Sequence, residues 1–250
     1  MGFWNAVNLS FTLAKADFKL KNEGSYLGIL WYLVNPILTF VLLSLIFYDR
    51  LGNYIPHYLA YVFFGVIMFN LLQKTLLESC KVIFANPVIK SIHFSRGSLV
   101  GAIVLKNMFS HFFEVALLLV LLVVFNIPIY GLIFYVFILA LFSIFLFGSA
   151  LILSSTNMYL LDLENIWLFL SSLLFFATPI FYTFGGQVKL FYLNLFNPLY
   201  FFISLARDYV LYSDFSRVWI LFGAIFYTLL FLLVGLLFFN KLKGKFAELI

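Results

Sequence analysis

Long apolar segments dominate the chain, and six of them approach the length of a membrane crossing. In windows of about 19 residues they cover positions 27–48, 57–73, 107–127, 132–153, 166–184 and 218–239. About 20 apolar helical residues cross the hydrocarbon core of a bilayer, which is about 30 Å thick. The runs do not alternate between apolar and polar residues, as the strands of a membrane barrel do. We therefore expect an all-α integral membrane protein with six transmembrane helices.

The start of the third predicted helix is the least well defined of these boundaries. Residues 99–105, which precede it, are also apolar, whereas Lys106, His111 and Glu114 interrupt the run that follows. We place the start of this helix at Asn107.

Two connections are too long for simple turns. Residues 78–98 carry Pro87 and Gly97 and place apolar side chains between basic ones. This pattern predicts a short cytoplasmic surface helix that lies along the membrane or inserts into a partner. Residues 185–217 begin with the turn signal Gly185-Gly186, yet they remain rich in Phe, Tyr and Leu. We expect outer re-entrant or interfacial segments here, between helices five and six.

Residues 1–26 are predicted to form an amphipathic interface helix, and no cleavable signal peptide is expected. Apolar and polar residues occupy different faces of this helix, the apolar ones being Phe3, Val7, Phe11, Ala14 and Phe18 and the polar ones Asn8, Lys15, Lys19 and Asn22. The alternative is a leader that only packs against the first span. The expected organisation is a single domain over 1–250, with this helix, a six-helix membrane part at 27–239 and a cytoplasmic tail at 240–250.

The composition excludes a soluble domain. Hydrophobic residues make up 65% of the chain and charged residues only 10%, whereas a soluble domain has roughly a quarter of its residues charged. With six crossings, eleven of the 15 Lys and Arg residues fall on the side of the termini and four on the other. Basic residues concentrate in cytoplasmic loops, so both termini are expected in the cytoplasm. The net charge of +5 follows from this asymmetry and does not require a nucleic-acid partner.

Few polar groups lie inside the predicted spans, and each carries an energetic cost. His111 and Glu114 are three residues apart and share one helix face. Pairing between them, or a face turned to a water-filled path, would offset the cost, and snorkelling toward the cytoplasm is the alternative. Asn35-Pro36 and Thr178-Pro179 permit kinks. Arg207 and Asp208 fall in the outer segment, where simple solvation would explain them.

The sequence lacks the motifs of common catalytic centres. It contains no phosphate-binding loop, no His-Glu-x-x-His, no Cys-x-x-Cys and no Gly-x-Ser-x-Gly. Cys80 is the single cysteine, and we interpret it as a spectator thiol. We expect no enzymatic activity, no metal site and no cofactor in this chain.

Four patches, in order along the chain, resemble the ABC-2 type permeases that export polysaccharides. The first is Asp-Phe-Lys-Leu-Lys-Asn-Glu-Gly-Ser-Tyr-Leu-Gly-Ile-Leu-Trp at 17–31, followed by Asn35-Pro36. The others are Asn-Pro-Val-Ile-Lys-Ser-Ile-His-Phe-Ser-Arg at 86–96, Thr-Pro-Ile-Phe-Tyr at 178–182, and Asn-Pro-Leu-Tyr at 197–200 with Arg207 beyond it. Asn22, Glu23 and Ser95 depart from the usual residues of the family.

The resemblance implies a homodimer of permeases in the cytoplasmic (inner) membrane, with two copies of a separate ABC ATPase that binds ATP and Mg. The substrate would be a lipid-linked polysaccharide of O-antigen (lipopolysaccharide), capsule or teichoic-acid type. The ATPase-coupling interface would comprise Lys19, Lys21, Glu23, Asn86, Lys90, His93 and Arg96. We assign Trp31, Asn35, His111, Glu114, Tyr182 and Arg207 to the substrate pathway.

Three alternatives remain open at this point. An ABC-2 exporter of a small hydrophobic drug or lipid would share the fold. An intramembrane transferase would need clustered acids or histidines at one depth, which only His111 and Glu114 offer. A proton-coupled secondary transporter is disfavoured, because neither an inverted repeat nor a series of buried carboxylates is evident.

Overall fold

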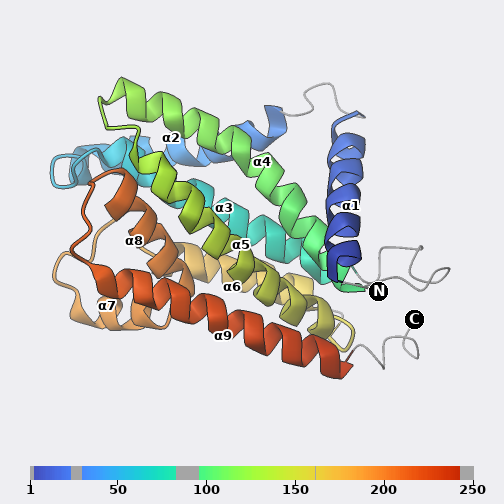
Figure 1. Cartoon of the computed structure of the whole chain (residues 1–250). Helices are drawn as coiled ribbons and strands as arrows, with labels where there is room; N and C mark the ends of the chain where they lie inside the picture. The colour runs from blue at the N-terminus through green and yellow to red at the C-terminus, as the bar shows by residue number, and fades with distance from the viewer. Residues whose placement is uncertain (1–2, 24–29, 83–95, 161, 243–250) are drawn as a thin grey trace.

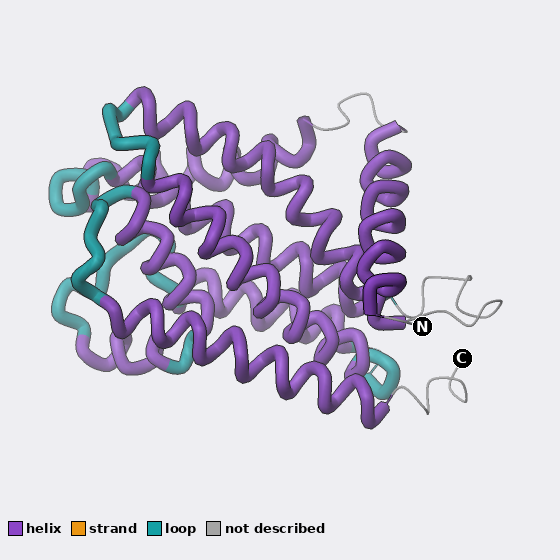
Figure 2. Tube along the Cα trace, viewed as in Figure 1, coloured by secondary structure: helices purple, strands orange, loops and turns teal. Residues whose placement is uncertain are grey.

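A computed structural model describes residues 3–23, 30–82, 96–160 and 162–242, and within these ranges all regular structure is helical (Figures 1 and 2). The helices are α1 (Phe3–Glu23), α2 (Trp31–Leu51), α3 (Tyr58–Lys81), α4 (Arg96–Val124), α5 (Gly131–Thr156), α6 (Leu163–Ala177), α7 (Val188–Leu195), α8 (Pro198–Val210) and α9 (Val218–Leu242). The expectation of an all-α membrane protein is confirmed at this level. Asn86, Lys90 and His93, most of the expected coupling helix, lie outside the described residues.

Within the described residues, five helices are long and apolar enough to cross a membrane: α2, α3, α4, α5 and α9. Helix α6 is apolar but has only 15 residues, and α7 and α8 form a bent pair with an angle of 103° between them. Such a pair is a broken span or a re-entrant segment, which gives up to six spans by length and composition. The expected re-entrant character of residues 185–217 fits this geometry.

Three predicted boundaries are wrong. The second predicted helix ends at Lys81, not at Gln73. The third predicted helix begins at Arg96, not at Asn107, and it includes the apolar stretch 99–105. Lys106 does not interrupt it, because its ammonium pairs with the Glu78 carboxylate at 2.8 Å. The fifth predicted helix ends at Ala177, not at 184, because Thr178 is extended and Pro179 follows it.

Helix α3 occupies the centre of the bundle. It packs against α2, α4, α5, α6 and α8. Its side chains are buried almost around the whole helix, and Val62, Phe63, Phe64 and Ile67 have no exposed surface. A helix that is apolar on every face is typical of such a buried position.

Helix α1 lies across one end of the bundle, close to the start of α4 and the end of α9 (Figure 1). It packs chiefly on α4. Ser10 and Ala14 are buried, and a Cβ on Gly101 of α4 would lie 2.9 Å from the Ser10 hydroxyl oxygen. The Phe18 ring stacks on Tyr32 with the ring centroids 5.8 Å apart. The predicted helix is thus present with one face buried, and its place in the headgroup layer stays a prediction.

Helices α5 and α9 approach each other closely at two glycines. A Cβ on Gly148 would lie 2.5 Å from the carbonyl oxygen of Phe231, and a Cβ on Gly235 would overlap the backbone of Gly148. Small residues let helix backbones approach closely in membranes, where packing replaces the hydrophobic driving force. Glycine at both positions therefore permits this crossing.

Candidate functional site

The structure gathers polar groups where the backbone leaves helix α6. After Ala177 the chain is extended at Thr178, and the carbonyl groups that follow have no partners within a helix. Backbone groups at membrane depth must be paired inside the protein, because lipid offers no hydrogen bonds. Side chains from α3, α7 and α8 provide those partners here.

Arg207 of α8 is the centre of this network, and its side chain is buried. Its guanidinium donates to the carbonyl oxygens of Pro179 at 2.7 Å and Ile180 at 2.6 Å. It also donates twice to the carbonyl oxygen of Tyr61, at 2.8 and 3.1 Å, and lies 3.4 Å from the centroid of the Tyr61 ring. Arg207 thus cross-links α3, α8 and the segment after α6.

Gly65 provides the space for this arrangement. A Cβ at this position would lie 2.5 Å from Nη2 of Arg207 and 2.9 Å from the carbonyl oxygen of Ile180. The guanidinium reaches the backbone of α3 only because Gly65 has no side chain. The sequence pattern did not identify this residue, since nothing in the surrounding run of apolar residues distinguishes it.

Two tyrosines of α3 complete the pairing of the segment after α6. The Tyr61 hydroxyl is 2.8 Å from the carbonyl oxygen of Tyr182 and 3.2 Å from that of Pro179. The Tyr58 hydroxyl donates to the carbonyl oxygen of Phe181 at 3.0 Å. Consecutive carbonyl groups from Pro179 to Tyr182 therefore all have donors from α3 or α8.

Two asparagines, at the end of α7 and just before α8, also form hydrogen bonds with the end of α6. Asn194 donates to the Ala177 carbonyl oxygen at 2.9 Å, and Asn197 donates to the Thr178 hydroxyl at 2.7 Å. Asn197 also caps α8, because its side-chain oxygen accepts from the Leu199 N–H at 3.1 Å. The bend between α7 and α8 is thereby fixed to the end of α6.

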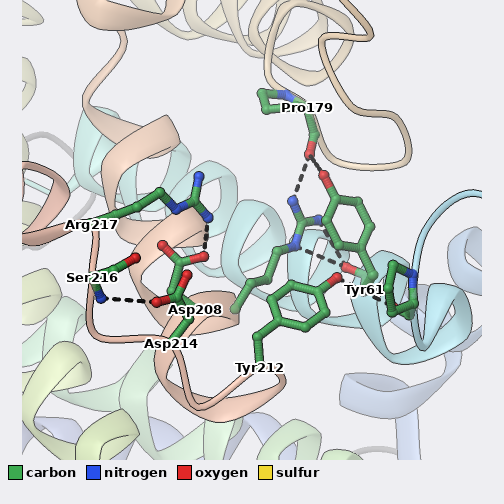
Figure 3. A network of polar contacts seen from close by, with 9 residues as sticks. Tyr61, Pro179, Asp208, Tyr212, Asp214, Ser216 and Arg217 are labelled. Carbon is green, nitrogen blue, oxygen red and sulfur yellow. Dashed lines mark hydrogen bonds and ion pairs between the residues drawn. The ribbon is translucent and has the colours of Figure 1, made fainter.

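Asp208 connects α8 to the start of α9. Its carboxylate is buried and pairs with the guanidinium of Arg217 (Figure 3). The intervening turn is closed by Asp214, whose carboxylate accepts from the Ser216 N–H at 2.9 Å. The Ser216 hydroxyl and backbone N–H hold the pKa of the Asp214 carboxyl below its usual range. Arg207 and Asp208 are therefore not solvated, so that alternative is wrong for both.

A second polar cluster lies inside the bundle. Nδ1 of His111 is 2.5 Å from the Glu114 carboxylate, and Nε2 of His111 is 2.9 Å from the Tyr135 hydroxyl. The Tyr135 hydroxyl also donates to the sulfur of Met68 at 3.2 Å. The pairing suggested by the spacing of His111 and Glu114 is present, and it joins α4 to α5 and α3.

The six residues expected along the substrate pathway do not form one site. Trp31 and Asn35 are exposed on α2, whereas His111 and Glu114 belong to the buried cluster. Tyr182 and Arg207 share the network after α6, where the Tyr182 hydroxyl contacts the Ala177 carbonyl oxygen at 2.9 Å. Their part in transport stays a prediction.

The coupling residues are described only in part. Lys19 and the backbone of Lys21 and Glu23 belong to the second half of α1, and Arg96 is the first residue of α4. Near this end, the amide of Asn107 donates to the Glu78 carboxylate at 3.0 Å, and Lys81 pairs with Glu164 at 2.7 Å. These contacts connect α3 to α4 and α6. No group of three or more His, Cys, Asp or Glu able to hold a metal occurs among the described residues.

The comparisons with known proteins agree with this architecture. Residues 8–211 match the ABC-2 type transporter family. Two proteins of Klebsiella pneumoniae, each named O-antigen export system permease protein RfbA, are 27% identical over 248 and 249 residues, which is 97% of this chain and 95% of each relative. A Myxococcus xanthus protein of the same name is 24% identical over 176 residues, 70% of this chain and 68% of the relative. With most of its residues covered by the family match, the chain belongs to the ABC-2 type transporter family, as a membrane permease subunit without an ATPase domain.

Proposed function

We propose that this protein is the transmembrane subunit of an ATP-driven exporter that moves a lipid-linked polysaccharide out of the cytoplasm. One observation carries the proposal: the similarity to the two O-antigen export permeases of Klebsiella pneumoniae extends over 97% of this chain and 95% of theirs. Similarity of that extent covers α1, the bundle and the bent pair together. ABC-2 permeases act with ABC ATPase partners, so hydrolysis is assigned to a separate subunit.

The arrangement of basic residues supports cytoplasmic termini. Helix α1, which carries Lys15 and Lys19, lies across the end of the bundle where α4 begins and α9 ends (Figure 1). The same end of the bundle carries Lys81 at the end of α3, Arg96 at the start of α4 and Lys241 near the end of α9. Basic side chains gather on the cytoplasmic side of a membrane, so the proposal places this end of the bundle in the cytoplasm.

The coupling segment, residues 86–96, precedes α4 directly. Helix α4 is in turn packed on α1 and is joined to α3 through Glu78 and Lys106. Because Lys81 also pairs with Glu164 of α6, a displacement of this segment has a packed route into α1, α3, α4 and α6. Closure of the ATPases would shift the permease between two arrangements along this route.

A second copy of the chain is part of the proposal. The described surface of α2, α6 and α9 exposes many large apolar side chains, among them Leu45 of α2, Phe176 of α6 and Leu237 of α9. Lipid covers such surface in a membrane protein, and a second permease can cover part of it. We propose a homodimer that works with two ATPase subunits.

Deletion of the gene, with complementation by a plasmid-borne copy, tests the function. Cells without the permease should lose the polysaccharide from their surface and accumulate it, lipid-linked, inside, and complementation should restore export. Susceptibility to hydrophobic drugs should be unchanged. Unchanged surface polysaccharide together with increased drug susceptibility would contradict the proposal and favour a drug or lipid exporter.

A further inference from the structure

A cavity of about 290 Å³ lies beside the Arg207 network. It is formed by the α2–α3 connection, the segment after α6, α7, α8 and the start of α9. These elements meet at the end of the bundle away from α1 (Figure 1). Its volume is at the lower end of the range of small-molecule sites, about 300–1,000 Å³.

Four aromatic rings form a closed circuit along one side of this cavity. The ring centroids of Phe184 and Phe191 are 5.5 Å apart, and those of Phe191 and Trp219 are 6.2 Å apart. Tyr200 closes the circuit, at 6.4 Å from Trp219 and 5.5 Å from Phe184. All four residues line the cavity. Because each ring is packed against two others, the wall is held in place before any ligand arrives.

Charged groups line the same cavity. Asp208 and Arg217 both border it and form an ion pair, but only Oδ1 of Asp208 takes part. Oδ2 of Asp208 is buried and has no hydrogen-bond partner in the described structure. Leaving a buried carboxylate oxygen without a donor is energetically unfavourable. Asp208, which borders the cavity, therefore has a buried acceptor that lacks a donor.

The aromatic wall and the Asp208–Arg217 pair together indicate which class of ligand the cavity can bind. A sugar has an apolar C–H face that suits an aromatic wall and hydroxyl groups that both donate and accept. A hydroxyl can donate to Asp208, whereas the phosphodiester of a lipid headgroup has no proton to donate at neutral pH. Arg217 has a side chain that is 45% exposed, so it can swing outward, admit a hydroxyl to Asp208 and donate to another.

We propose that this cavity binds one neutral sugar unit of the exported polymer, with its C–H face on Trp219 and Tyr200 and a hydroxyl on Asp208. The inference rests on the proposed function and on the orientation that places this end of the bundle outside the cytoplasm. In that position the cavity holds sugar units as they emerge from the membrane.

Ligand-observed NMR on the full-length permease in lipid nanodiscs tests the site. The probes are the methyl glycosides of glucose, galactose, mannose, rhamnose and N-acetylglucosamine, with glycerophosphoethanolamine as a probe for a lipid headgroup. At least one glycoside should bind saturably, and Trp219→Leu should weaken it about tenfold. Tyr54→Ala should weaken it too, because Tyr54 lines the cavity and is 83% exposed, so that its loss leaves the packing intact.

Phe196→Ala is the matched control, since Phe196 is 82% exposed and does not line the cavity. Absence of glycoside binding, equal binding by all variants, or binding of glycerophosphoethanolamine alone would overturn the inference. The deletion strain separates this result from the proposed function. If the deletion abolishes surface polysaccharide while no glycoside binds to the unmodified permease, only the sugar site is wrong. If the deletion leaves export unchanged, the proposed function itself fails.

Discussion

The Nη2 atom of Arg207 occupies the position beside α3 where a side chain on Gly65 would begin, with only 2.5 Å between Nη2 and a Cβ built on that glycine. The two residues are far apart in the sequence, but the glycine is required for the position of the arginine side chain. Gly65 exposes the backbone of a central helix, and Arg207 uses that opening to join it to the segment after α6.

Substituting Gly65 by alanine should therefore destabilise the protein, although alanine favours helix formation by about 1 kcal/mol over glycine. The added methyl group overlaps the guanidinium and the Ile180 carbonyl oxygen, so the cross-link must move. We expect a lower melting temperature of the detergent-solubilised permease. Gly97→Ala is the control, because the nearest atom to a Cβ there is 3.9 Å away, and this variant should be unchanged or more stable. Equal melting temperatures for Gly65→Ala and the unmodified protein would contradict the steric argument.

Arg207→Met should lower stability by at least about 3 kcal/mol, because it leaves several buried carbonyl groups without donors. Arg207→Lys should recover only part of this loss, since an ammonium group cannot match the fork geometry of guanidinium. Denaturation of the two variants in detergent gives the comparison. Arg50→Met, at the exposed end of α2, should have little effect. A full recovery by lysine would indicate that charge alone, without the geometry, accounts for the role of Arg207.

Tyr135→Phe should cost about 0.6–2 kcal/mol, the usual range for a hydrogen bond between membrane helices. It removes the hydroxyl that contacts both His111 and Met68 and leaves the ring in place. Export should be retained, because the hydroxyl acts by joining α5 to α4 and α3. Tyr192→Phe, on the exposed side of α7, is the control for losing a tyrosine hydroxyl. Loss of export in a stable Tyr135→Phe variant would instead point to a direct part in transport.

Reversing the charges of Lys90 and Arg96 together should uncouple ATP hydrolysis from export. Both belong to the segment 86–96 proposed to contact the ATPase, so the double Glu variant should hydrolyse ATP in the reconstituted complex while surface polysaccharide falls. The matched double variant, Lys90→Arg with Arg96→Lys, keeps the charge and should export normally. Full export by the charge-reversed protein would refute the coupling assignment.

Hydropathy alone was enough to locate α2, α3, α5 and α9, because long uninterrupted apolar runs have no other stable place than a membrane or a core. It failed at α4, where the partner that neutralises Lys106 lies on a different helix. It also failed at the end of α6, because the apolar run continues beyond Thr178-Pro179 although the helix does not.

In the candidate site, too, contacts between residues close in the sequence could be predicted, whereas contacts between different helices could not. The spacing of His111 and Glu114 is local, and their pairing could be anticipated from it. Tyr135, the third member, comes from another helix and follows no such spacing. Arg207 could be singled out as a charge in an apolar region, but its burial depends on carbonyl groups of Tyr61 and Pro179, which only the fold brings near.

The glycine contact between α5 and α9 has a consequence for how the permease changes shape. At Gly148 and Gly235 the two backbones are in contact without side chains between them, so sliding or rotation there would create immediate overlap. The pair is therefore expected to travel as a single rigid unit. Any hinge used in the transport cycle has to lie elsewhere in the bundle.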